Sequence, residues 1–145
     1  MNSLQDLYCT AEQNGIPIDN FELGKTESVS MMDISDQSCN IAIDYKKIRS
    51  SADENTKLAH ELGHCMTGSF YNEYSPLDIR QKHENAADRW AIEHVIPLKE
   101  LHDAIFDGRD NVWDLADYFN VSLRFMQKAL CWYIFGNLCV DMYFN

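Results

Sequence analysis

The sequence lacks the features that mark several large classes of protein. No run approaches the roughly 20 apolar residues that a membrane-spanning helix requires. The first residues, Met1 to Thr10, include no Lys or Arg and no apolar stretch, so no secretory signal is expected. Internal repeats and long linkers rich in Gly, Ser or Pro are also missing. We therefore predict a cytoplasmic protein without membrane contact, folded as a single domain over residues 1–145.

Basic residues are scarce as well. The chain has 12 Lys and Arg residues against 23 Asp and Glu residues, which gives a formal net charge of −11. A surface of this sign repels phosphate backbones, so we expect no direct binding of nucleic acid. The charge would tolerate a basic partner, but a simple contribution to solubility is the more economical interpretation.

The five cysteines, at positions 9, 39, 65, 131 and 139, form no recognisable framework. Their number is odd, their spacings are irregular and no Cys-x-x-Cys pair occurs, which disfavours both a disulfide scaffold and a cysteine zinc site. We therefore expect reduced thiols in a cytosolic protein, most of them buried.

Hydrophobic periodicity changes along the chain and predicts a mixed architecture. A short helix is expected over Ser3–Asn14. Apolar residues then follow a strand pattern over Val29–Met32 and Cys39–Tyr45, with the polar segment Asp33–Ser38 as the connection of a hairpin. Four further helices are expected: one capped by Ser51 and ended by Gly68, one from Ser75-Pro76 to about Ile96, and two near Asn111–Phe119 and Ser122–Phe135. The predicted fold class is α+β, mainly helical with a small N-terminal antiparallel or mixed sheet.

One predicted helix carries a run with metal-site spacing, His60-Glu61-Leu62-Gly63-His64. Histidines four residues apart lie one turn apart on the same helix face, where both imidazoles can bind one tetrahedral ion. Glu61 is rotated by about a quarter-turn from His60, so its carboxylate can reach an activated water without being a ligand. The pattern predicts a metal site with Glu61 as general base.

A pair of acidic residues on the next helix can complete that site. Glu84 and Asp88 are four residues apart and share a face, and the alanines beside them would let the two helices approach closely. We predict Glu84 as the third ligand, which leaves the open position of a catalytic zinc site, although two His and one carboxylate also suit iron(II). Asp88 is expected to orient a ligand histidine through its other ring nitrogen. The alternative is a solvated helix face, which the nearby histidine motif makes less favourable.

Three further residues are candidates for donating a hydrogen bond to an oxyanion. Tyr71 and Tyr74 fall in the loop between the two helices, and His83 adjoins Glu84 but points about 100° away from it on a helix. Packing of the loop tyrosines on the surface is an equally good interpretation.

With these residues in place, the chain resembles the ImmA/IrrE family of metallo-endopeptidases. The resemblance rests on the His60–His64 motif, the segment Glu84-Asn85-Ala86-Ala87-Asp88-Arg89-Trp90-Ala91 and the closing Val95-Ile96-Pro97. Trp90 stands where the family usually has Phe, and Ile96 where it usually has Met. The segment Gly15-Ile16-Pro17-Ile18 and the strand before the motif are also similar to the family's layout.

The resemblance implies a zincin-like fold and a peptidase that uses Zn²⁺, with His60, His64 and Glu84 as ligands and Glu61 as the base. Some members cleave a helix-turn-helix repressor of a phage or mobile element, so the implied partner is a transcriptional repressor that serves as protein substrate. An extended substrate is expected to add as a strand to an edge of the small sheet, with Cys39–Tyr45 as the candidate edge.

Two other functions remain open from the sequence. The first is a non-proteolytic zinc-binding protein that regulates transcription or docks a partner, for which Glu61 would be unnecessary. The second is DNA binding through residues 112–130, which have the pattern of two helices joined by a tight turn. The second of these helices holds only Arg124 and Lys128 as basic residues, so a packing element or a repressor-docking surface is the favoured interpretation.

Overall fold

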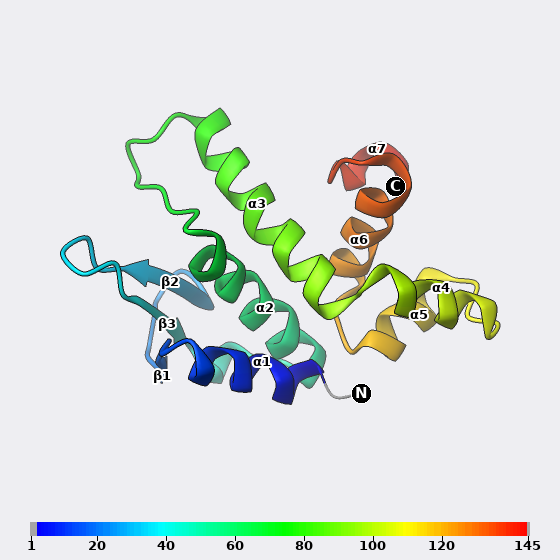
Figure 1. The fold of residues 1–145 in the computed structure, drawn as a ribbon, viewed down its shortest axis with the longest axis horizontal. Coiled ribbons are helices and arrows are strands. Elements are labelled where there is room, and N and C mark those ends of the chain that lie inside the picture. The colour runs from blue at the N-terminus through cyan, green and yellow to red at the C-terminus, as the bar shows by residue number, and fades with distance from the viewer. Residues whose placement is uncertain (1–2, 145) are drawn as a thin grey trace.

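The computed structural model describes residues 3–144 and shows a mainly helical chain with a small mixed sheet, which confirms the predicted α+β class (Figure 1). Residues 1, 2 and 145, which the predicted domain includes, lie outside the described part. Within that part, no helix combines the length and the apolar character needed to cross a bilayer. The elements in chain order are α1 (Ser3–Gln13), β1 (Ile18–Asn20), β2 (Ser28–Met32), β3 (Cys39–Ile43), α2 (Ser51–Thr67), α3 (Leu77–Val95), α4 (Leu98–Phe106), α5 (Val112–Phe119), α6 (Leu123–Phe135) and α7 (Val140–Tyr143).

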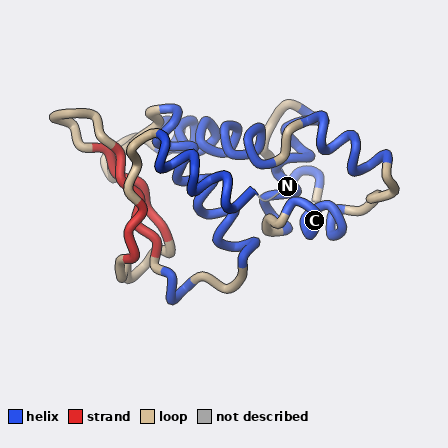
Figure 2. The backbone as a smooth tube through the Cα atoms, turned by 60° about the horizontal axis from the view of Figure 1, so that its bottom comes forward, coloured by secondary structure: helices blue, strands red, loops and turns tan. Residues whose placement is uncertain are grey.

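The sheet has the strand order β1-β3-β2 and lies at one end of the molecule, as Figure 2 shows. The predicted hairpin is confirmed: β2 pairs antiparallel with β3, and the amide of Asp33 donates to the carbonyl of Ser38 at its turn. β1 pairs parallel with β3 and was not predicted, because three residues are too few to show alternation. β3 is therefore the central strand. The expectation that Cys39–Tyr45 forms the substrate edge is wrong, and β2 is an edge strand.

The core forms around α2, which packs against α3, α1 and one face of the sheet. Leu58 and Leu62 of α2 are fully buried, as are Ile41 and Ile43 of β3. The helix begins one residue earlier than predicted, because the side chain of Ser50 rather than Ser51 accepts the capping hydrogen bond, from the amide of Asp53. It ends as predicted at Gly68, which takes the left-handed conformation.

The secondary-structure elements in the second half of the chain are all helices. α3, α5 and α6 match the predicted helices, and Ser122 caps α6 through the amide of Phe125. α4 and the short α7 were not predicted. Pro97 ends α3 as expected, but it also serves as the cap of α4, which then buries Leu101 and Ala104. A proline here separates two helices instead of introducing a loop.

The cysteines differ from the expectation of buried, reduced thiols. Cys39 and Cys65 form a disulfide with a Cα–Cα distance of 5.8 Å, and it joins the start of β3 to the last turn of α2. Cys9 and Cys139 are exposed free thiols, and Cys131 is buried. The pair is 26 residues apart, and only the packing of the sheet against α2 brings the two residues together, so the spacing could not reveal it.

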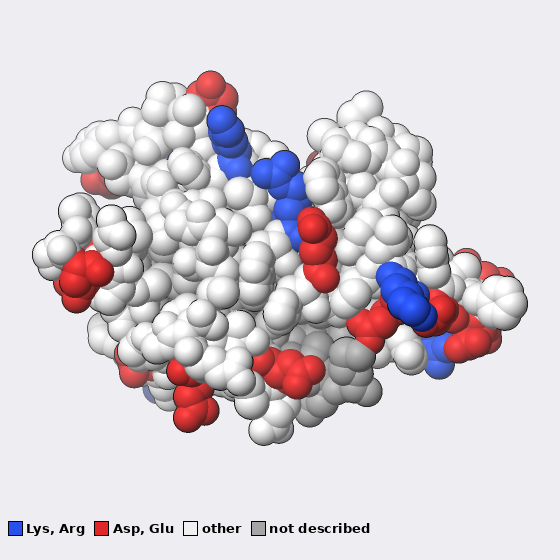
Figure 3. Space-filling model, viewed as in Figure 1, with Lys and Arg blue, Asp and Glu red and all other residues white. Residues whose placement is uncertain are grey.

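Acidic side chains are distributed over the surface. Figure 3 shows Asp and Glu around the rim of the face that it draws, with fewer Lys and Arg among them. This distribution agrees with the net charge of −11 and shows no basic face on that side.

Candidate metal centre and cleft

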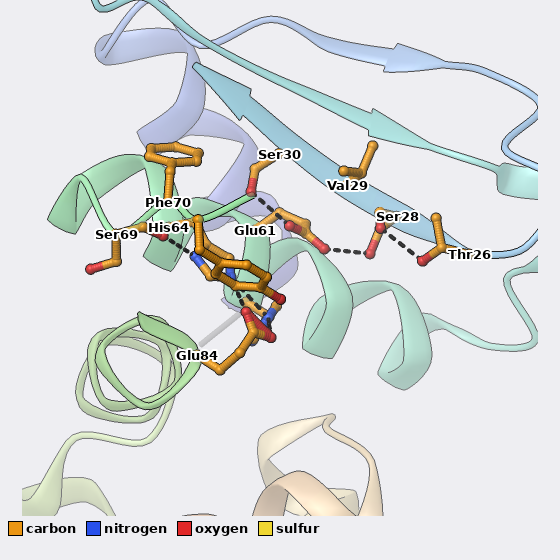
Figure 4. Close-up of a pocket in the computed structure, with 11 residues that line it drawn as sticks. Thr26, Ser28, Val29, Ser30, Glu61, His64, Ser69, Phe70 and Glu84 are labelled. Carbon is orange, nitrogen blue, oxygen red and sulfur yellow. Dashed lines mark hydrogen bonds and ion pairs between the residues drawn. The ribbon is translucent and has the colours of Figure 1, made fainter. Parts of the chain in front are cut away.

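Three predicted ligands converge from α2 and α3, and Figure 4 labels two of them, His64 and Glu84. His60 and His64 lie one turn apart on α2, and their Nε2 atoms are 3.2 Å from each other. Glu84 of α3 approaches both rings: Oε1 is 3.2 Å from Nε2 of His60, and Oε2 is 2.8 Å from Nε2 of His64. The ligand atoms of the three residues all lie within 4.8 Å of one another, so together they could hold one metal ion.

The ligands meet because α2 and α3 pack with almost no space between their backbones. A Cβ atom added to Gly63 would overlap the carbonyl oxygen of Ala87 on α3. Ala87 and Ala91 are fully buried in this contact region, as their small size predicted. The glycine inside the histidine motif therefore sets the separation between the two helices.

Each histidine ring is held through its second nitrogen. Nδ1 of His60 lies 2.7 Å from Oδ1 of Asp88, and the other carboxylate oxygen of Asp88 accepts from Lys128 Nζ at 2.8 Å. Nδ1 of His64 faces the carbonyl oxygen of Ser69. These bonds fix the ring orientations and leave both Nε2 atoms directed at Glu84. Asp88 lies where the sequence predicted, whereas the contributions of Lys128 and Ser69 were not foreseen.

Charge compensation inside this cluster shifts the pKa values of its members. Burial lowers the pKa of His60, but hydrogen bonds with Asp88 and Glu84 outweigh it and raise that pKa to about 10. Burial raises the pKa of Glu84, and its bonds with the two histidines bring it well below the usual range. Positive charge between these groups is thus strongly favoured. Two imidazole nitrogens and a carboxylate oxygen form a donor set that fits zinc. When no metal is bound, protons between these donor atoms take its place.

The carboxylate of Glu61 lies on the side of the cleft that faces β2, as Figure 4 shows. Its side chain is buried, with only 7% of the residue exposed. Oε2 accepts a hydrogen bond from Ser28 Oγ at 2.8 Å, and Oε1 accepts one from Ser30 Oγ at 2.9 Å. Both serines belong to β2, so the acid connects the histidine helix with the edge strand. Sequence patterns do not reveal this contact, because it depends on how the sheet packs on α2.

A cleft of about 460 Å³ opens over these groups. Its walls come from three places: the ligand face of α2 and α3, the edge strand β2, and the loop that follows α2. The residues that line it are Thr26, Ser28, Val29, Ser30, His60, Glu61, His64, Ser69, Phe70, Tyr71 and Glu84.

Of the three candidate oxyanion donors, the structure brings Tyr71 to the cleft. Its ring is 42% exposed, and burial and the nearby Glu84 carboxylate raise the pKa of its phenol, which keeps the hydroxyl protonated as a donor. His83 stacks on the ring of Tyr71 with a centroid separation of 6.4 Å and is not among the cleft residues. Tyr74 is 87% exposed and also lies outside the cleft.

The basic residues of α6 are engaged with acidic partners. Besides the bond between Lys128 and Asp88, Arg124 Nη1 lies 3.0 Å from Oδ1 of Asp141 in α7. The helix thereby supports the ligand helix α3, and both side chains that could have contacted phosphate already have a carboxylate partner.

The comparison with protein families gave a match that covers most of the chain. The family model described as the IrrE N-terminal-like domain, Peptidase M78, matches residues 11–130. The matched range includes the sheet, α2, α3 and most of α6. No curated protein gives a significant match to the chain.

Proposed function

The chain belongs to the Peptidase M78 family of IrrE N-terminal-like domains, and on that basis we propose that it is a zinc-dependent endopeptidase that cleaves a protein substrate. The family confirms the resemblance noted from the sequence and supports a metallopeptidase-type function. The observation that carries the finer proposal is the convergence of His60, His64 and Glu84 beside the buried carboxylate of Glu61, in an open cleft.

In this proposal, His60, His64 and Glu84 hold the zinc ion, and Asp88 keeps the ring of His60 in the required orientation. When bound, zinc would polarise the scissile carbonyl and lower the pKa of a water molecule. The set of three protein ligands is the one found in open, catalytic zinc sites. A purely structural site would have no use for the carboxylate of Glu61 next to it.

Glu61 is proposed to act as general base and then as general acid. It removes a proton from the water that attacks the scissile carbonyl carbon, so that a C–O bond forms. It then passes the same proton to the amide nitrogen as the C–N bond breaks, which releases a free amine and a carboxyl group. Tyr71 is placed to donate a hydrogen bond to the oxyanion that develops on the carbonyl oxygen.

The substrate is proposed to bind in extended form along β2. This strand is an edge of the sheet, and its residues 28–30 line the cleft. Backbone pairing would hold a peptide across the ligands whatever its sequence, and the side-chain contacts would select among substrates. The resemblance to ImmA/IrrE proteins further suggests a helix-turn-helix repressor of a phage or mobile element as the substrate.

A non-proteolytic role as a zinc-binding regulator is the alternative, and one experiment separates the two. Wild type, Glu61→Gln and the exposed control Glu93→Gln are purified, their zinc content is measured, and each is incubated with the repressor from the same genetic neighbourhood. We expect one zinc per chain in all three proteins. Cleavage should occur with wild type and the control, and fall by roughly 10²–10⁴-fold in Glu61→Gln.

Zinc in all three proteins without any cleavage would favour the regulator. An absence of zinc from wild type, or equal cleavage by Glu61→Gln, would contradict the peptidase proposal. Binding of DNA by the wild type with an affinity that falls as salt rises would support the DNA-binding alternative, through residues 112–130.

A further inference from the structure

Building on the proposed peptidase function, we propose that Ser28 and Ser30 are positioning residues that aim the carboxylate of Glu61 during the reaction. Each carboxylate oxygen of Glu61 has one serine hydroxyl as donor, at 2.8 and 2.9 Å. A glutamate side chain has several rotatable bonds, and bonds to both oxygens restrict its last torsion as well as its position. The two bonds thereby hold the base from the strand side of the cleft.

The register of the sheet shows that the two serines occupy positions where apolar side chains would be expected. Ser28 is paired with Ile43 and Ser30 with Ile41, so the serines share the sheet face of two fully buried isoleucines. On that face an apolar side chain would be the usual choice. Two hydroxyls instead occur at alternate positions of β2, and both contact the one buried acid of the facing helix.

Hydroxyl groups suit a base that gains and loses a proton in each cycle. The ionised carboxylate only accepts hydrogen bonds, so both serines donate to it. When Glu61 holds the proton taken from water, one of its oxygens becomes a donor, and a serine hydroxyl can rotate to accept from it. A backbone amide in the same place could only donate. The serines therefore support both forms of Glu61, while the proton itself travels from water to the leaving amine.

The position of the serines also links the base to substrate binding. Their side chains face α2, and the backbone of the same strand forms the sheet edge along the cleft. A peptide that pairs with β2 would order residues 28–30, and with them the two serines that hold Glu61. The strand would then bind the substrate through its backbone and aim the base through its side chains.

The test uses the zinc-loaded full chain with variants Ser28→Ala, Ser30→Ala, the double variant, and the conservative Ser28→Thr/Ser30→Thr. Ser35→Ala is the matched control, because its hydroxyl also donates to a carboxylate, that of Asp33, but in the exposed hairpin turn. We expect kcat to fall roughly tenfold in each single alanine variant and roughly 100-fold in the double variant, with KM and zinc content nearly unchanged. The threonine variant should recover most of the rate, and Ser35→Ala should equal wild type.

The same substitutions are then made in Glu61→Gln. If the serines act through Glu61, they should change the residual rate by less than about twofold in that background. Losses that remain tenfold there, or alanine variants as active as wild type, would overturn the inference. Either result leaves the peptidase proposal standing as long as wild type is active and Glu61→Gln is at least about 100-fold slower.

Crystal structures of the zinc-loaded wild type and double alanine variant give a readout that needs no activity. In wild type we expect a single conformation of the Glu61 carboxylate, bonded to both serines. In the variant we expect the carboxylate to be displaced or to occupy alternate conformations. An unchanged carboxylate in the variant would overturn the inference even if no substrate were cleaved.

Discussion

The two walls of the cleft are held in place by different means. On the helical wall, His60, His64 and Glu84 are fixed by a second layer of partners and by direct contact between the backbones of α2 and α3. The strand wall has an open edge, with the exposed Met31 and Met32 at the end of β2. The difference indicates that the chain alone assembles the proposed ligand set, whereas the strand wall keeps an unpaired edge, to which the proposed substrate would add.

Removal of a ligand should have the largest effect on the helical wall. Glu84→Ala takes away the only carboxylate oxygen of the donor set, so we expect loss of stoichiometric zinc and of all peptidase activity. Zinc content by metal analysis after dialysis checks this. Ser30→Ala, on the opposite wall, should keep its zinc. Equal loss of zinc in both variants would show that the two walls are not independent.

Closing the space between the helices should be nearly as damaging. Gly63→Ala forces a methyl group into the backbone of Ala87, so we expect a loss of about 1–3 kcal/mol in unfolding free energy together with weaker zinc binding. Gly136→Ala is the control, because it strains a left-handed helix end but meets no atom within 4 Å. That control should lose stability and keep its zinc affinity, as measured by denaturant unfolding and competitive chelation.

Lys128, which supports His60 through Asp88, should contribute less to zinc affinity than a ligand does. Lys128→Met removes the bond to Asp88, and we expect zinc affinity to fall by roughly 10-fold, at the lower end of the range for such partners. Arg124→Met, on the same helix, breaks only an exposed pair with Asp141 and should change the affinity little. A similar loss in both variants would mean that the whole of α6, and not this bond, supports the site.

The pH should also change the stability of the metal-free protein, through the helical wall of the cleft. The folded pKa of His60, about 10, lies above its ordinary value of 6.5. Its contribution to stability is therefore fully present below pH 6.5 and is lost as the pH rises through 10. Zinc must displace that proton, so uptake near neutral pH should release protons and weaken as the pH falls.

Urea unfolding midpoints in the presence of a chelator, at pH 6.5 and 9.5, test this directly. The midpoint should fall with rising pH in wild type, and the fall should be smaller in His60→Asn. The same fall in both proteins would assign the pH dependence to other groups.

The sequence predicted the helical wall much better than the strand wall, and the reason is geometric. The spacing of His60, His64 and Glu84 within and between helices is a local property, because 3.6-residue periodicity determines which residues share a face. The contact of Ser28 with Glu61 depends on which face of β2 meets α2, and that follows only from the register with β3. Lys128 contacts Asp88 from 40 residues away, and that contact likewise depends on how the elements pack together.

The elements that were missed have equally physical causes. β1 is only three residues long and pairs through its backbone, so its side chains show no pattern. α4 follows a proline that also ends α3, and the proline was interpreted only as a stop. The cap of α2 was shifted by one residue because two serines are adjacent, and either one matches the pattern of a capping residue.

The disulfide between Cys39 and Cys65 closes a covalent ring in the chain, and this ring contains some of the site residues but not all of them. β3 and most of α2 lie within the ring, and so do His60, His64 and Glu61. Glu84 stands outside it, attached to the other ligands by packing and polar contacts alone. In the oxidised chain, partial unfolding can detach α3 while the ring keeps the histidines and the base on the sheet.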